Sequence, residues 1–433
     1  MTEQEASGTA PRPEPPVCAI GNATGLVGAV TLVPLIIIAF LTEMSVHAAT
    51  LMFLTGIALA MIAWALLIER VHLRPSTGLD FSRVRPMAEV VDLTRTKMHG
   101  LFATFALMGL GYFTIKTYGS GPYAEYLLLF AIAVPVILIV APFYIAFVTA
   151  RMDDPKDGLW HFGRLVWFER DGTDMEKVKD HLRAWTIKGF FLAFMVSVLP
   201  WSVEGVLLFD MSQATSDPVK TIVFIVQIAF LFDICFGTIG YILTMRPLDS
   251  HIRSANPYLS AWVVALICYP PFVLMGTDGP LNYQSGTHEW TVAFAGMDTV
   301  LVLWGLAIVA CAIVYAWATV VFGLRFSNLT HRGIITAGPY RYFKHPAYLA
   351  KNLMWWLVYI PFLTSATVTE AVQNSLLLLI VNVVYLLRAR TEEKHLMADT
   401  AYQAYAAWIA EHGVLERSWQ RLSRLSSRLY AVR

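Results

Sequence analysis

Long apolar segments constrain this chain more than any other feature of its sequence. Eight segments of about 18 residues or more lie near residues 22–41, 47–68, 99–117, 122–149, 188–210, 219–245, 258–276 and 297–322. A further pair near residues 347–366 and 370–387 predicts a tight hairpin. Lipid offers no hydrogen-bond partner to an open strand edge, so such segments cross a bilayer as helices. The sequence therefore predicts an all-α polytopic membrane protein with about ten transmembrane helices.

The composition agrees with this fold class and excludes several functions. Hydrophobic residues make up 57% of the chain and charged residues 15%, whereas a soluble domain carries about 25% charged residues. The formal net charge of +1 leaves no dominant basic face, which argues against nucleic acid as a partner. The four cysteines are far apart and have no metal-ligand spacing, so we expect neither a bound metal nor a disulfide framework.

The basic residues orient the predicted helices. Of the 32 Lys and Arg residues, 29 fall in segments 69–98, 151–188, 246–257, 324–351 and 388–433. All five segments lie on one side of the membrane if the spans alternate from a cytoplasmic N-terminus. Loops rich in Lys and Arg stay on the cytoplasmic side. We therefore expect both termini to be cytoplasmic and the protein to reside in the inner (plasma) membrane of a bacterium.

Three polar segments have recognisable local patterns. Residues 1–18 are polar and proline-rich, which predicts a disordered cytoplasmic tail. Residues 413–433 combine an apolar stripe with several arginines, which predicts a basic amphipathic helix on anionic headgroups. Residues 173–176 have the spacing of a capping box, which predicts a short amphipathic helix ending near Thr186.

Two blocks near the C-terminus combine ionisable and aromatic residues beside apolar segments. The first block, residues 338–348, reads Gly-Pro-Tyr-Arg-Tyr-Phe-Lys-His-Pro-Ala-Tyr. Proline suits the first position of a helix, so we expect Pro346 to begin one and His345 to lie just outside it. The free N–H groups there would bind an anion, and the aromatic faces would attract a cation such as a sulfonium. The alternative is an interfacial aromatic belt with a basic cap.

The second block, residues 388–396, reads Arg-Ala-Arg-Thr-Glu-Glu-Lys-His-Leu. Arg388 and Glu392 are four residues apart and share one helical face, whereas Arg390 and Glu393 point elsewhere. The Arg388 guanidinium can bind a carboxylate or phosphate in a bidentate manner. Glu392 can accept hydrogen bonds from two adjacent hydroxyls, as on a ribose. The alternative is a simple ion pair between Arg388 and Glu392 at the membrane boundary.

Together the two blocks, the hairpin between them and the Tyr402/Tyr405 pair resemble the isoprenylcysteine carboxyl methyltransferase (ICMT) family over about residues 325–410. The resemblance implies a catalytic part at residues 323–412. Residues 19–322 are then an eight-span membrane module of unknown role. The family implies S-adenosyl-L-methionine as the methyl donor and a lipid-like small-molecule or lipidated acceptor that enters from the membrane lipids.

The resemblance also implies roles for individual residues. Cofactor-binding positions are Ile334, Ile335, Tyr340, His345, Pro346, Ala347, Tyr348 and Glu392. Arg388 would contact the acceptor, and Arg388 and His345 are the expected catalytic residues. The chain departs from the usual family pattern at Lys344, where many relatives have Arg, and at Ala350, where Gly is frequent.

Carboxylate methylation suits these residue types. The acceptor carboxylate is already ionised at pH 7, so the enzyme has mainly to align it with the methyl group and exclude water. This chemistry needs no metal. An amine or thiol acceptor would need a base, for which His345 and His395 are the nearby candidates.

Two other functions stay open at this point. A membrane sterol-type reductase has a related helical arrangement but uses NADPH. A transporter or sensor could use Asp233 and Glu204, since acids inside membrane helices are often functional.

Overall fold

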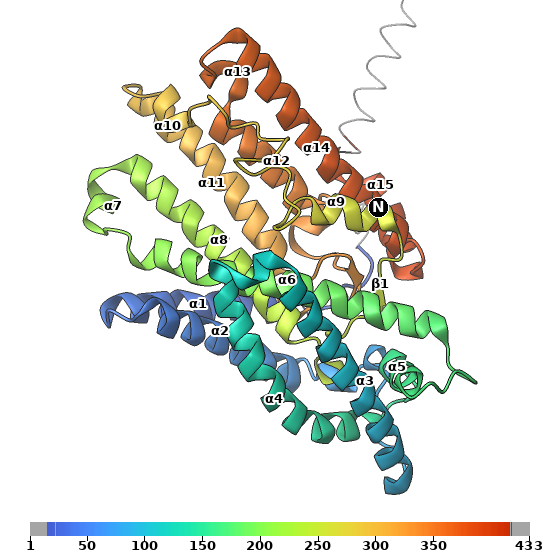
Figure 1. Ribbon diagram of the computed structural model, residues 1–433. Coiled ribbons are helices and arrows are strands. Elements are labelled where there is room, and N and C mark those ends of the chain that lie inside the picture. The colour runs from blue at the N-terminus through green and yellow to red at the C-terminus, as the bar shows by residue number, and fades with distance from the viewer. Residues whose placement is uncertain (1–14, 22, 416, 418–433) are drawn as a thin grey trace, which may run out of the picture.

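A computed structural model describes residues 15–21, 23–415 and 417 of this chain (Figure 1). Most of the expected N-terminal tail and of the expected amphipathic helix at residues 413–433 lies outside these residues. The helices are α1 Thr24–Leu41, α2 Val46–Ala63, α3 Met87–Thr114, α4 Pro122–Thr149, α5 Gly158–Val166, α6 Met175–Leu207, α7 Ser212–Ser216, α8 Pro218–Ile242, α9 Leu259–Leu266, α10 Trp290–Ala293, α11 Asp298–Val320, α12 Pro346–Tyr359, α13 Pro361–Thr364, α14 Val368–Leu396 and α15 Thr400–His412. Two short strands, β1 Ser254–Ala255 and β2 Thr330–His331, pair in an antiparallel manner.

Seven helices in the described part of the chain are long and apolar enough to cross a membrane. They are Thr24–Leu41, Val46–Ile68, Tyr123–Thr149, Met175–Leu207, Pro218–Ile242, Asp298–Val320 and Val368–Leu396. The prediction of an all-α polytopic membrane protein is therefore confirmed. Each of the seven overlaps one of the ten spans expected from the sequence.

The other three expected spans differ from the sequence-based picture. The span at 99–117 is the apolar second half of α3, whose first half is charged. The prediction of one helix over residues 258–276 is wrong, because α9 ends at Leu266 and an irregular segment containing Pro270 and Pro271 follows. Proline lacks the N–H that a helix interior needs. The span at 347–366 is divided into α12, of 14 residues, and α13, of four, at Ile360 and Pro361.

The helix expected after residue 173 is also longer than predicted. Asp174, rather than Thr173, caps it by accepting hydrogen bonds from the N–H groups of Glu176 and Lys177. The helix does not end near Thr186 but runs on to Leu207 as α6. No proline lies near residue 186, and Gly189 does not interrupt the helix, so the polar first turns and the apolar span form one helix.

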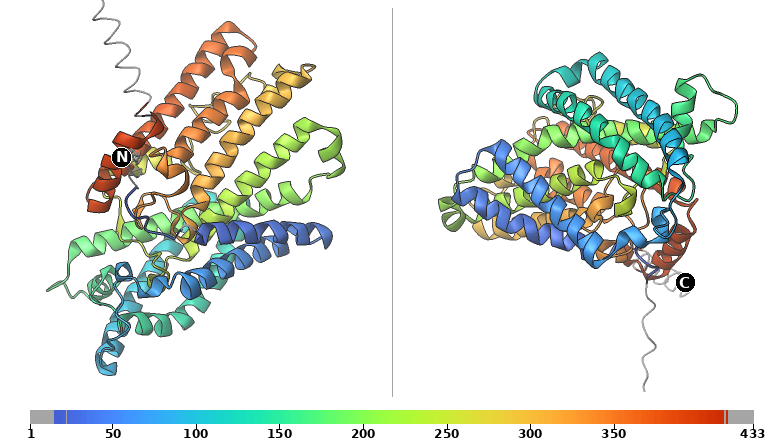
Figure 2. Two further views of the ribbon diagram at one scale, coloured as in Figure 1. Left: turned by 180° about the vertical axis from the view of Figure 1, so that it is seen from behind. Right: turned by 90° about the horizontal axis from the view of Figure 1, so that it is seen from below.

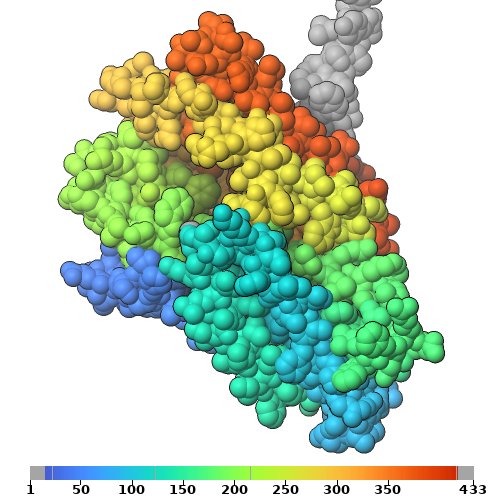
Figure 3. All heavy atoms as spheres, viewed as in Figure 1, coloured from blue at the N-terminus to red at the C-terminus, as the bar shows by residue number. Residues whose placement is uncertain are grey.

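Helix α11 lies between the two halves of the chain. It packs along α8 on one side and along α12 on the other (Figure 1). The antiparallel pairs α1–α2 and α3–α4 both pack against α6 (Figure 2), which in turn packs on α8. The segment between α9 and α10 lies over α12 and α14 (Figure 3), where buried Tyr283 contacts the apolar face of α14. The C-terminal helices are thus packed directly onto the preceding module.

A buried ion pair joins the loop before β1 to the segment after α11. Asp249 is 1% exposed and Arg325 3% exposed, and the Arg325 guanidinium donates to the Asp249 carboxylate. The Ser76 hydroxyl donates to the same carboxylate at 2.6 Å. Nearby, the buried Arg332 side chain donates to the backbone carbonyls of Ser250 and Gly240. These contacts fix the segment that leads from α11 into the first motif block.

Replacing Asp249 with asparagine should therefore destabilise the protein strongly. Loss of one partner leaves a buried charge without compensation, which costs about 3 kcal/mol or more. We expect a clear fall in the melting temperature of the detergent-solubilised protein. Asp92→Asn is the matched control, because Asp92 pairs with Arg95 at 2.9 Å but both side chains are about 70% exposed, and exposed pairs contribute little. Equal melting temperatures for the two variants would contradict a stabilising role for the buried Asp249–Arg325 pair.

Candidate functional site

The first motif block folds as a tight turn followed by the start of α12. Gly338 has a φ of 57°, and a β-carbon there would lie 2.7 Å from Val321 Cγ1, so this position requires glycine. The chain makes a 3₁₀ turn over Gly338–Arg341 and enters α12 at Pro346, with His345 as the residue just before the helix. The prediction that Pro346 begins this helix is confirmed.

Side chains of the two blocks contact each other directly. The Tyr348 hydroxyl donates to Glu392, 44 residues further along the chain. His345 Nε2 lies 3.1 Å from Glu393 Oε1, and Lys344 Nζ lies 3.4 Å from Glu393 Oε2. The His345 and Tyr348 rings are stacked with their centroids 5.5 Å apart. Glu393 was expected to point away from the site, but it orients the loop by binding His345.

Arg388 lies in a cage of tyrosine rings. Its side chain is 3% exposed, and its guanidinium carbon lies 5.0 Å from the ring centroids of Tyr348 and Tyr385 and 5.7 Å from that of Tyr269. One guanidinium N–H donates to Asn328 Oδ1 at 3.2 Å, and Nε has no partner. No carboxylate lies within ion-pair distance among residues 15–21, 23–415 and 417. The alternative, an ion pair between Arg388 and Glu392, is therefore absent from this set.

One cavity brings the two blocks together. Of the nine residues predicted for the site, eight line it: Ile334, Ile335, Tyr340, His345, Ala347, Tyr348, Arg388 and Glu392. Pro346 is the exception, since it is buried at the first position of α12. His395, the alternative base, also lines the cavity and lies 2.9 Å from the Ser254 hydroxyl. The structure thus brings the predicted residues together, while their roles stay predictions.

The backbone wall around Ile334 is held by the N-terminal segment and by α15. Its carbonyl accepts a hydrogen bond from the Ala19 N–H at 2.9 Å. The Ile334 side chain packs against buried Tyr402 and Tyr405 of α15, and the Tyr405 hydroxyl donates to the Tyr340 carbonyl at 2.8 Å. The Tyr402/Tyr405 pair therefore supports this wall and lines the cavity beside it.

Tyr340 lines the cavity. Burial raises the pKa of its hydroxyl well above the ordinary value, and the nearby Tyr405, Glu392 and Asp233 raise it further. Its ring meets that of Phe322 edge-on, with centroids 5.3 Å apart. The hydroxyl therefore stays protonated at neutral pH, and Tyr340 offers an aromatic face rather than a base.

Several residues of the cavity wall were not predicted for this site. Tyr269 comes from the irregular segment after α9, Asn328 from the loop after α11, and Lys351 from α12. Asp233 of α8 was considered for a separate ion site, yet it lines this same cavity. Glu204, considered together with it, is exposed on α6. The sequence carries no pattern for these contacts, because each depends on how distant helices pack.

The described residues contain no group of three or more His, Cys, Asp and Glu side chains that could hold a metal ion.

Comparison with known proteins identifies one region of the chain. Residues 299–398 match the model of the isoprenylcysteine carboxyl methyltransferase (ICMT) family. The match begins in α11, upstream of the boundary expected at residue 323, and includes both motif blocks. No curated protein and no solved structure gave a match. The resemblance seen in the sequence is therefore confirmed, and at the level of the family it indicates a membrane methyltransferase.

Proposed function

We propose that this protein transfers a methyl group from S-adenosyl-L-methionine to a carboxylate on a lipid-like or membrane-embedded acceptor. The observation that carries the proposal is Arg388, a buried guanidinium without a carboxylate partner among the described residues, in the cavity of the family-matched segment. Burying a lone charge is costly, so a cation kept here is best explained by an anionic substrate.

Three residues of the cavity, Glu392, Tyr340 and Tyr348, fit the methyl donor. Glu392 accepts one hydrogen bond from Tyr348, and a carboxylate has further lone pairs for the two hydroxyls of a ribose. The faces of Tyr340 and Tyr348 suit a sulfonium. When bound, S-adenosyl-L-methionine supplies an activated methyl group on a positively charged sulfur, which leaves as a neutral thioether.

The other residues position the acceptor. Arg388 holds its carboxylate by charge-assisted hydrogen bonds, and the surrounding tyrosines exclude water. No base is required because the carboxylate is already ionised. His345 lines the cavity, held by Glu393, and would act as the base only for an amine or thiol acceptor.

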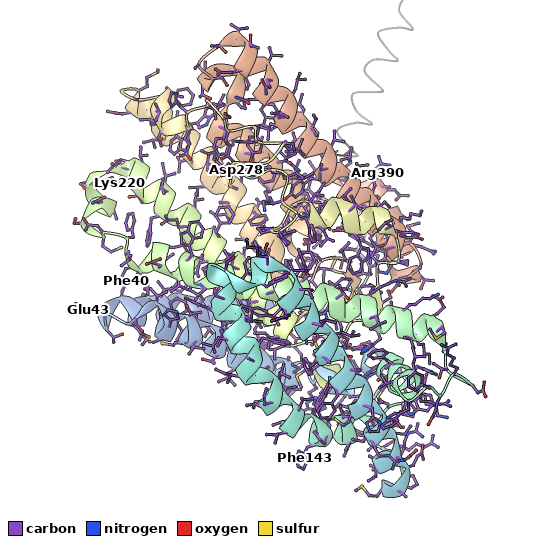
Figure 4. All side chains as sticks on the ribbon, in the orientation of Figure 1. Phe40, Glu43, Phe143, Lys220, Asp278 and Arg390 are labelled. Carbon is purple, nitrogen blue, oxygen red and sulfur yellow. The ribbon has the colours of Figure 1, made fainter. Side chains whose placement is uncertain are left out.

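The placement of the protein in the membrane forms part of the same proposal. Arg390 lies near one end of the molecule, and Lys220 and Glu43 lie at the other (Figure 4). The end with the cavity carries most Lys and Arg residues, so it faces the cytoplasm by the positive-inside rule. Both termini are then cytoplasmic, and the chain resides in the inner membrane of a bacterium. Residues 19–322 form a module that precedes the catalytic part.

Calorimetry on the purified protein in detergent tests this function. We expect S-adenosyl-L-methionine to bind with a micromolar dissociation constant, on the order of −8 kcal/mol. NADPH should not compete with it. A folded protein that binds NADPH but not S-adenosyl-L-methionine would contradict the proposal and support a reductase. Binding of neither ligand would also refute it.

A further inference from the structure

Asp233 lies outside the family-matched segment but inside the cavity. It belongs to α8, and its side chain is 7% exposed. The Tyr315 hydroxyl donates to Asp233 Oδ2 at 2.8 Å, and the Thr319 hydroxyl donates to the other oxygen. Both donors belong to α11. A carboxylate can accept about four hydrogen bonds, so Asp233 can still bind a ligand group that carries N–H donors.

Lys351 of α12 faces the same space. Its ammonium lies 5.4 Å from the Tyr315 ring centroid and 5.5 Å from the Trp355 ring centroid. It lines the same cavity as Asp233. Within the described part of the chain, however, no carboxylate comes within 4.0 Å of its nitrogen. Asp233 and Lys351, which have opposite charges, therefore line one cavity without forming an ion pair with each other.

Tyr340 connects these charges to the proposed donor site. Tyr340, Glu392 and Asp233 all line this one cavity. A ligand bound by its ribose at Glu392 therefore shares one cavity with Asp233. S-adenosyl-L-methionine has such an order of groups: ribose, sulfonium, and then an ammonium and a carboxylate on one carbon.

We propose that Asp233 and Lys351 bind the amino-acid end of the methyl donor. Asp233 accepts hydrogen bonds from the α-ammonium group, and Lys351 pairs with the α-carboxylate. The inference rests on the proposed function and adds a role for the preceding helices, since α8 supplies part of the donor pocket. Opposite charges held apart in a buried cavity complement a zwitterion, whose two groups would otherwise lose hydration without replacement.

The competing explanation is purely structural. Asp233 also links α8 to α11 through two hydroxyls, and an acid inside a membrane helix can serve packing alone. The two explanations differ in one respect. A packing role affects every ligand of the cavity equally, whereas a binding role affects only ligands that carry the amino-acid end.

The experiment measures the binding of S-adenosylhomocysteine and of 5′-methylthioadenosine, which lacks the amino-acid end, by calorimetry. Asp233→Asn and Lys351→Met should each weaken S-adenosylhomocysteine binding at least tenfold and leave 5′-methylthioadenosine binding within twofold. The carboxamide in Asp233→Asn would still accept from one of the two hydroxyls and can donate to the other, and retained 5′-methylthioadenosine binding reports a folded cavity. Glu204→Gln removes an exposed acid from the same module and should change neither affinity.

Each other outcome decides against the inference. Equal weakening of both ligands in the two variants would assign Asp233 and Lys351 to packing. Unchanged affinity for S-adenosylhomocysteine would exclude them from the donor pocket. If the wild-type protein binds neither ligand, the proposed function itself fails, which is a different result from failure of these two variants alone.

Discussion

Replacing Glu392 with glutamine is expected to weaken S-adenosyl-L-methionine binding by about 10- to 100-fold. Hydrogen bonds to a charged group contribute about 1.5–3 kcal/mol, and every 1.4 kcal/mol is about a factor of ten in affinity. Glutamine has one acceptor oxygen where glutamate has two, and the Tyr348 hydroxyl already donates to Glu392. Calorimetry with the purified variant measures the effect directly.

The control for this variant is Glu411→Gln, an exposed acid on α15. It should bind the donor as the wild type does. An analogue without the ribose hydroxyls should bind the wild type and Glu392→Gln with similar affinity. If Glu392→Gln weakens both ligands equally, Glu392 does not bind the ribose. If it weakens neither, the donor lies elsewhere in the cavity.

The local part of the site could be predicted from the sequence. Pro346 begins α12 with His345 outside it because both preferences act within one turn of chain. Glu392 and Arg388 lie four residues apart on one helix, so their common face follows from helical geometry. The long apolar spans were equally accessible, since length and hydrophobicity alone determine which helices can cross a bilayer.

The remainder of the site depends on tertiary packing. The sequence did not indicate that Arg388 lies among three tyrosines, one of them Tyr269. Tyr269 reaches it only because α9 ends early and the following segment returns over α14, an arrangement that hydropathy alone presents as another span. Asp233 could be identified as unusual, but its distance from the motif blocks in sequence, about 100 residues, concealed that it lines their cavity.

Replacing Arg388 with methionine should abolish most acceptor methylation but spare donor binding. Loss of one partner from a buried, hydrogen-bonded charge pair costs about 2–5 kcal/mol, so kcat/KM should fall by about 30-fold or more. The assay follows labelled methyl transfer to an S-prenylated cysteine with a free carboxylate. Arg390→Met changes an exposed residue of the same helix (Figure 4), so it is the control and should keep wild-type activity.

Two further readouts separate substrate binding by Arg388 from a structural role. Because no carboxylate among the described residues pairs with this cation, its removal relieves a desolvation cost, and the melting temperature of Arg388→Met should not fall. The wild type should methylate the S-prenylated cysteine that carries a free carboxylate. The corresponding carboxamide should not compete with this acceptor. Arg388→Met should bind the carboxylate acceptor and its carboxamide with similar, low affinity, because neutral methionine cannot distinguish an anion from an amide. Arg388→Lys should recover part of the discrimination, since lysine restores the charge but not the bidentate geometry. A methionine variant that still prefers the carboxylate would show that another cation, with Lys351 as the nearest candidate, holds the acceptor.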